Sequence, residues 1–403
     1  MKRIVSKLHL WVSVPFGLVI TITCFTGAML VFESEITALC SGGASSVEPK
    51  GTPMPVWQII ERVEPTLDSG VEVTGVVIPF AADEAYKVNL SKPRRAALYV
   101  NQYTGEVQGE YRRPHFFDVM RRLHRWLMDR DPGNGAIFWG KVIVGASTMA
   151  FVVILLTGLL VWWPRNRKML KNRLKIVVSK GKNRFWYDLH VAGGFYALLF
   201  LLAMALTGLT WSYGWYNKAF YSMFSNEKAE TDVVQPVGEQ YEVGATTPLS
   251  SSVWGGAVDA VSSATAQVDA VSGATGHAAR ENSPYYGWQA AVDNVLGKER
   301  FNTITVSAGS ISVALSGWGN QRAFDRYKFD EATGEILSAD YYNSSSPRNM
   351  AVGWVRTLHV GTWGGLFSKL LYFFAALLGA SLPLTGYYLW IKRLYVKKRK
   401  AEK

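Results

Sequence analysis

Long apolar stretches alternate with longer polar segments along the 403-residue chain, and four of the apolar stretches contain no acidic residue. A helix needs about 20 apolar residues to cross a bilayer, and each of the four reaches that length. They are Leu10–Phe32, Val142–Trp163, Val191–Tyr213 and Leu366–Ile391. The pattern therefore predicts an α-helical membrane protein with four transmembrane helices.

The two long segments between these stretches contain short runs in which apolar and polar residues alternate, which indicates strands. Each segment also contains a Thr-Gly-Glu turn, at Thr104 and at Thr333. Two extramembrane α+β domains are therefore predicted. The expected elements are a helix over 56–67, strands over 71–79, 85–90, 96–101, 301–315 and 324–329, and an amphipathic surface helix over 116–127.

Basic residues flank the apolar stretches unequally. Residues 164–184 hold nine Lys or Arg and no acidic residue, and both ends of the chain are basic. Lys and Arg concentrate on the cytoplasmic side of membrane helices. Both termini are therefore expected in the cytoplasm, with the chain in a bacterial inner membrane and the α+β domains in the periplasm. The formal net charge of +12 is then a topology signal and does not indicate nucleic-acid binding.

The dipeptide Leu-His occurs four times and accounts for four of the six histidines. His9 and His190 are each followed 17 residues later by Thr-Gly. Lys141 and Lys369, which each follow another Leu-His, are followed 16 residues later by Thr-Gly. These repeats indicate an internal duplication with two histidines in each half.

On the predicted topology, His9 and His190 lie at the cytoplasmic face, and His124 and His359 lie at the outer face. An ionisable residue in a membrane is a functional candidate, and imidazole is an axial ligand of haem iron. The spacing therefore predicts two b-type haems, each between two of these histidines. One alternative is a purely interfacial role for the histidines, with small residues that only pack helices. Another is a copper or zinc site, although few Cys, Asp or Glu stand near them.

Other residues are expected to support the two haems. Glycine lets a flat macrocycle approach the backbone, and cations neutralise haem propionates. The chain has no CxxCH motif and no cysteine cluster, which excludes covalent c-type haem and an iron–sulfur centre. The candidates are Gly27 and Gly208 near the outer pair, Gly158 and Gly386 near the cytoplasmic pair, Arg121 and Arg356 before the outer histidines, and Lys7 and Arg184 beside the inner ones.

Together these motifs resemble the PepSY-associated transmembrane family, and the resemblance covers almost the whole chain. The residues that carry it are Leu8-His9, Leu123-His124-Arg125-Trp126-Leu127, Thr157-Gly158 running to Trp162-Trp163-Pro164-Arg165, Leu189-His190 with Gly193-Gly194, Thr207-Gly208 and Leu358-His359. The Thr-Gly-Glu turns are similar to those of PepSY domains. Members of that family include inner-membrane reductases that release iron from ferric siderophores in the periplasm, and some bind two haems.

The expected organisation follows the duplication. In order, it comprises transmembrane helix 1 (1–32), a PepSY-like domain (33–115), an interfacial helix and turn (116–139), transmembrane helix 2 (140–163), a basic loop (164–188), transmembrane helix 3 (189–213), a second PepSY-like domain with an Ala/Ser/Gly-rich insert (214–358), transmembrane helix 4 (359–391) and a basic tail (392–403).

The insert contains a second motif. Asp269–Thr275 resembles the acceptor sequence for covalent attachment of FMN, which a flavin transferase esterifies to the last threonine. Thr275 is therefore the candidate residue, and Thr265 in an earlier and less similar copy is the weaker one. The alternative is a linker of small residues, because no complete FMN-binding domain surrounds the motif.

The function expected from the sequence is electron transfer through two haems to a periplasmic acceptor, with ferric iron in a siderophore as the substrate. No nucleotide-binding glycine motif occurs, so the donor is expected to be a separate cytoplasmic reductase, a small carrier or quinol. The alternative is a non-enzymatic sensor or assembly module that the membrane helices only anchor.

Overall fold

The computed structural model describes residues 2–93, 95–111, 113–133, 135–225, 283–296, 301–315 and 319–401. The chain forms two compact units. The helical unit contains Met1–Glu33, His115–Glu230 and Trp354–Lys403, and the sheet unit contains Ser34–Pro114 and Thr231–Gly353. Each unit is therefore assembled from segments that lie far apart in the sequence.

The helical unit contains the predicted membrane spans. Within the described residues, four helices are long and apolar enough to cross a membrane, so the four-span prediction is confirmed. The spans are α1 (Lys2–Leu30), α5 (Trp139–Trp162), the run of α7 (Lys182–Asp188), η2 (Leu189–Gly193) and α8 (Gly194–Ser212), and α14 (Gly365–Ala401), of which Gly365–Val396 is the spanning part.

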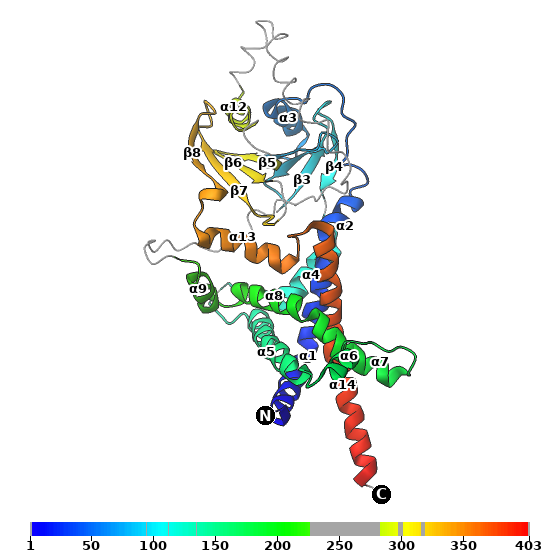
Figure 1. Ribbon diagram of the computed structural model, residues 1–403. Coiled ribbons are helices and arrows are strands. Elements are labelled where there is room, and N and C mark those ends of the chain that lie inside the picture. Colours follow the sequence, from blue (N-terminus) through cyan, green and yellow to red (C-terminus); the bar gives the residue numbers. More distant parts are fainter. Residues whose placement is uncertain are drawn as a thin grey trace. The chain divides into compact units, whose positions relative to one another are not determined.

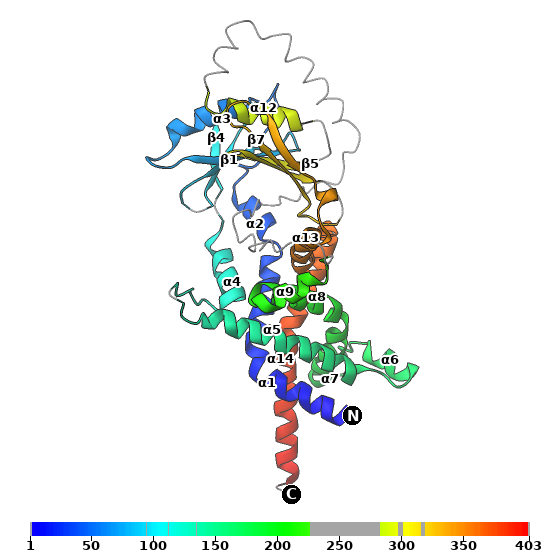
Figure 2. The same cartoon turned by 90° about the vertical axis from the view of Figure 1, so that its left-hand side faces the viewer.

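Close packing holds the spans together. α1 packs against α5 and α14, and α8 packs against the same two helices. Figures 1 and 2 both show α1 beside α14. The shared core contains Ile20, Phe151, Leu201 and the small residues Ala197 and Ala375. Lipid tails are as apolar as these side chains, so association depends on small residues that let helices approach.

Two local features set the ends and bends of the spans. α5 ends at Trp162 because Trp163 precedes Pro164, which disfavours helical backbone in its neighbour, and Trp163 has a non-helical ψ of 116°. η2 is a single π-helical turn, an element found mostly inside helices at functional sites. It contains His190.

Shorter helices connect the spans. A helix lies where the amphipathic surface helix was predicted over 116–127: α4 begins at His115 and ends at Trp126, and Phe117 is its fully buried residue. The shorter helices are α2 (Glu33–Cys40), α4 (His115–Trp126), α6 (Arg167–Arg173), α9 (Gly214–Ser222) and α13 (Pro347–Val360).

The sheet unit is one eight-stranded antiparallel sheet in the order β4-β3-β2-β1-β5-β6-β7-β8. Helices α3 (Val56–Val63) and α12 (Tyr286–Val295) lie on the same face, as Figure 2 shows, and share one apolar core with it. The strands are β1 (Val73–Pro79), β2 (Tyr86–Leu90), β3 (Ala97–Val100), β4 (Val107–Tyr111), β5 (Phe301–Ser307), β6 (Ser310–Leu315), β7 (Phe324–Phe329) and β8 (Ile336–Asp340). Single 3₁₀ turns occur at η1 (Glu64–Thr66) and η3 (Tyr342–Ser344).

The sheet modifies three sequence predictions. The two α+β halves exist, but they share a sheet and a core, because β1 pairs with β5 and neither is left as an exposed edge. The single strand expected over 301–315 is a hairpin that turns at Gly309, whose φ is +62°. The helix expected over 56–67 ends at Val63, because Pro65 continues the chain as the 3₁₀ turn η1.

The register between β1 and β5 has two-fold symmetry. Gly105 and Gly334 occupy equivalent Thr-Gly-Glu turns, both with φ of +74°, and lie 229 residues apart. With that offset, Val306 is the counterpart of Val77. Val76 pairs with Val306, and Val77 pairs with Thr305, the counterpart of Val76. The duplicated halves of the sheet unit therefore pair like the two subunits of a symmetric dimer.

Candidate functional site

The four Leu-His histidines form two pairs in the helical unit. The ring centres of His9 and His190 are 6.4 Å apart, with ring planes at 82°. Those of His124 and His359 are 6.1 Å apart, with ring planes at 66°. These are the two groupings that the sequence spacing predicts.

Every one of these histidines makes the same contact with a Thr-Gly dipeptide on a neighbouring helix. The imidazole Nδ1 lies within hydrogen-bond distance of the threonine hydroxyl and of the backbone carbonyl three residues before it. We call this arrangement the Thr-Gly contact. The distances are His9 to Ile154 O 3.1 Å and Thr157 Oγ1 3.1 Å, His124 to Thr23 O 2.8 Å and Thr26 Oγ1 3.3 Å, His190 to Leu382 O 3.1 Å and Thr385 Oγ1 2.9 Å, and His359 to Met204 O 3.0 Å and Thr207 Oγ1 3.0 Å.

The Thr-Gly contact determines which imidazole nitrogen carries the proton. A carbonyl oxygen can only accept a hydrogen bond, so Nδ1 must donate. The Nε2 lone pair is then free for a metal ion, and Nδ1 donation to an oxygen is the usual support of a metal-binding histidine. Burial lowers the pKa of His359 to about 3, with His124 adding to the shift, and burial also lowers the pKa of His124. Both imidazoles are therefore neutral at physiological pH.

The glycine of each contact makes room for the imidazole. A Cβ on Gly27 would lie 2.9 Å from Cε1 of His124, and one on Gly158 would lie 3.2 Å from Cε1 of His9. The corresponding distances are 3.2 Å between Gly208 and His359 and 3.5 Å between Gly386 and His190. The sequence assigned these glycines to close approach of a macrocycle. In the structure, the edge of an imidazole lies against each of them.

The contacts lie within the duplicated halves, whereas the pairs lie between them. His9 on α1 contacts α5, and His124 on α4 contacts α1, all in the first half. His190 on η2 contacts α14, and His359 on α13 contacts α8, all in the second half. Each pair therefore joins one histidine of each half.

The pair distances fit a metal ion between the rings. Two imidazoles that bind one ion from opposite sides, at about 2.0 Å each, have ring centres roughly 6 Å apart. Both observed distances agree. Among the described residues, no group of three or more His, Cys, Asp or Glu could hold a metal ion, so a bare copper or zinc site lacks its remaining protein ligands. A haem supplies its own four nitrogen ligands and needs only the two axial imidazoles.

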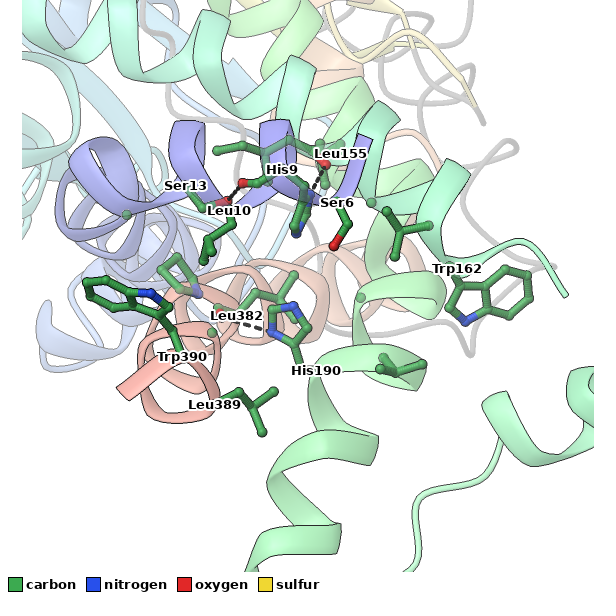
Figure 3. A pocket seen from close by; sticks show the side chains of 18 of the residues that line it. Ser6, His9, Leu10, Ser13, Leu155, Trp162, His190, Leu382, Leu389 and Trp390 are labelled. Atoms are coloured by element: carbon green, nitrogen blue, oxygen red, sulfur yellow. Dashed lines mark hydrogen bonds between the residues drawn. The ribbon is translucent and has the colours of Figure 1, made fainter. Parts of the chain in front are cut away.

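A cavity of about 360 Å³ surrounds the His9–His190 pair. Figure 3 shows the two imidazoles projecting toward each other into this space, between Ser6 and Leu10 of α1 and Leu382 of α14. The lining is predominantly apolar, as expected for a cofactor site. The basic residues in the lining are Arg173 and Arg393.

The cations predicted from the sequence have other partners. Arg121 makes two hydrogen bonds to the carboxylate of Glu33, at 3.0 and 2.8 Å. Arg184 is paired with the buried Asp188 at 2.7 Å. Arg356 stands one turn before His359 on α13, and its charge contributes to the lowered pKa of that histidine. Arg173 and Arg393 could not be distinguished in the sequence, because many similar residues surround them in basic segments.

The two histidines outside the Leu-His dipeptides and the remaining sequence candidates are placed as follows. His115 begins α4, outside both pairs. Lys7 lies on α1, two residues before His9, and is exposed. Thr275 and Thr265 of the two flavin-attachment motifs, together with His277, lie outside the described residues. The threonines of the Thr-Gly contacts were visible as repeats in the sequence, but their bonds to histidine were not.

The fold and the spans define a multi-pass α-helical membrane protein with an extramembrane antiparallel sheet. The chain belongs to the family of the PepSY-associated TM region, whose model matches residues 6–393. The match includes both histidine pairs, the second and third spans in full and most of the first and fourth. No curated protein matches the chain.

Proposed function

We propose that this protein carries electrons across a bacterial inner membrane through two b-type haems, one between His9 and His190 and the other between His124 and His359. The observation that supports it is the pair geometry. Two imidazoles of opposite halves face each other at 6.4 and 6.1 Å, and each is fixed by the same Thr-Gly contact.

Each haem would supply one-electron oxidation and reduction, which no protein side chain in the site provides. The chain's own residues position and tune it. Each Thr-Gly contact fixes the imidazole orientation and keeps the proton on Nδ1. Donation from Nδ1 also makes the ring a stronger ligand. The predominantly apolar walls around His9 and His190 keep the local dielectric constant low.

The two pairs lie near opposite ends of the spans. Along α1, 18 residues separate His9 from Gly27, which contacts His124. At about 1.5 Å per residue this is roughly 27 Å, close to the thickness of the hydrocarbon core. The basic segments favour a cytoplasmic position for both termini. On that orientation, a haem held by His9 and His190 would accept electrons on the cytoplasmic side, and a haem held by His124 and His359 would deliver them to the periplasm.

We propose ferric iron in a siderophore as the acceptor. One electron converts Fe(III) to Fe(II), which the hard oxygen ligands of such chelators bind less tightly, so the iron is released for uptake. The donor would be a separate cytoplasmic reductase, a small carrier or quinol. If a flavin transferase attaches FMN to Thr275, the flavin would serve as the exit carrier beyond the outer haem.

Spectroscopy of the purified full-length protein tests the proposal. We expect two haems per chain and a reduced spectrum with two b-type components. His9→Ala and His190→Ala should remove the same component, His124→Ala and His359→Ala should remove the other, and His115→Ala should remove neither. A colourless protein from haem-replete cells would reject the proposal and favour the sensor or assembly function.

A further inference from the structure

The indole of Trp162 presents a buried donor without an acceptor at the edge of the cavity around His9 and His190, called the inner cavity below. Trp162 is the last residue of α5, one turn beyond the Gly158 that contacts His9. Its side chain is 8% exposed, and its Nε1 has no hydrogen-bond partner among the described residues. Burial of an N–H group without an acceptor is costly, so such a group indicates a ligand atom that accepts from it.

The indole is held rigidly in place. It stacks on Phe195 of α8 with ring centres 3.9 Å apart and planes 8° from parallel. Both rings line the cavity that contains His9 and His190. A donor fixed by stacking loses little conformational freedom when it binds an acceptor.

A cation lies next to this donor. Arg173 of α6 donates from Nη1 to the carbonyls of Val161 at 3.1 Å and of Trp162, and it also lines the cavity. A guanidinium has five N–H donors, and within the described part of the chain Arg173 bonds through Nη1 alone. The remaining donors can therefore bind an anion beside the indole. Bonds from arginine to carboxylates are charge-assisted and strong.

We propose that Trp162 Nε1 and the Arg173 guanidinium form a carboxylate site at the edge of the inner cavity. The ligand must combine one or more carboxylates with an apolar body, because the rest of the cavity lining is predominantly apolar. This inference rests on the proposed function, under which the carboxylate is a propionate of the haem between His9 and His190. The site would set which edge of that haem points toward α6.

The duplication provides a matched control. Trp390 follows Thr385 by five residues, as Trp162 follows Thr157, and it lines the same cavity from α14. Figure 3 shows the two indoles on opposite sides of the histidine pair. Trp390 is only partly buried, so its N–H does not require a ligand acceptor.

The test compares protohaem with its dimethyl ester, in which both carboxylates are blocked. The full-length His124→Ala protein, which keeps only the His9–His190 pair, is stripped of haem and titrated with each form. We expect protohaem to bind about tenfold more tightly or better, as loss of charge-assisted hydrogen bonds implies. Trp162→Phe and Arg173→Met are then added separately to this protein, and each should bring the ratio of the two dissociation constants close to one. Trp390→Phe, added in the same way, should leave the ratio unchanged.

Each outcome decides a different point. Trp162→Phe keeps the stack on Phe195, so haem binding with an unchanged ratio in both substituted proteins would overturn the carboxylate site and leave the proposed function intact. An equal loss of preference in Trp390→Phe would also overturn it. A parent protein that binds neither form would remove the proposed function, and the carboxylate site with it.

Discussion

The four Thr-Gly contacts differ in how closely the glycine approaches the imidazole, and this difference predicts a graded response to alanine. A Cβ at Gly27 would lie 2.9 Å from His124, which is too close for carbon atoms, so the ring must move. The ring cannot move freely, because Nδ1 is bonded to Thr23 O at 2.8 Å. At Gly386 the distance is 3.5 Å, an ordinary van der Waals contact.

The expected magnitudes follow from these distances. Overpacking a well-packed site costs about 1–3 kcal/mol, so Gly27→Ala should weaken binding of the His124–His359 haem roughly 5- to 150-fold. Gly386→Ala should retain both haems, and because alanine favours a helix over glycine by about 1 kcal/mol, it should not destabilise α14. Gly158→Ala and Gly208→Ala, both at 3.2 Å, should fall between these limits.

Haem content per chain, measured on purified protein with separate quantification of the two spectral components, provides the assay. The matched control is the unsubstituted protein prepared in parallel, with thermal unfolding to check that each variant is folded. Equal haem loss in Gly386→Ala and Gly27→Ala would contradict this steric explanation. Loss of the His9-dependent spectral component in Gly27→Ala would also contradict it.

Three further predictions concern tuning, topology and the flavin motif. Thr157→Val should raise the midpoint potential of the haem at His9 by up to about 60 mV, which corresponds to a tenfold change in the relative affinity for its two oxidation states. Thr157→Ser, which keeps the hydroxyl, should not; equal shifts of the two variants in a redox titration would contradict this. Reporters fused after Lys403 should be active only in the cytoplasm; periplasmic activity would reverse the proposed direction of transfer. With a flavin transferase present, mass spectrometry should find FMN on Thr275, lost in Thr275→Ala and kept in Thr265→Ala. An unmodified Thr275 peptide from such cells would favour the alternative that this motif is a linker of small residues.

Much of the helical unit could be predicted because its signals are local or periodic. Span length follows from hydrophobicity, and the offsets from histidine to Thr-Gly place His9 and Gly27 at opposite ends of one helix. The role of the threonines could not be predicted. Thr26 and its counterparts also donate to carbonyls in their own helices, as threonine in any helix can. Only the three-dimensional structure shows that a histidine from another helix reaches the same oxygen.

The arginines illustrate a different limit. Arg121 was assigned to a propionate because it stands three residues before His124, and helical spacing places such residues on one face. Spacing within one helix could not show that Glu33, 88 residues earlier, approaches from another helix. Arg173 was missed for the opposite reason. It is one of nine basic residues in the loop 164–184, and sequence alone does not show which of them faces the cavity.

The pairing of β1 with β5 and the pairing of histidines have the same structural basis. In the sheet unit, each half alone would expose a central strand as an edge, and the symmetric register of Val76 with Val306 removes both edges. In the helical unit, each half alone positions two imidazoles through its own Thr-Gly contacts, but each facing pair of imidazoles takes one histidine from each half. Each Thr-Gly contact therefore forms within one half of the chain. The complete sheet and both histidine pairs require the two halves together. The duplication thus accounts for why the candidate sites number two and why each contains one histidine from either half.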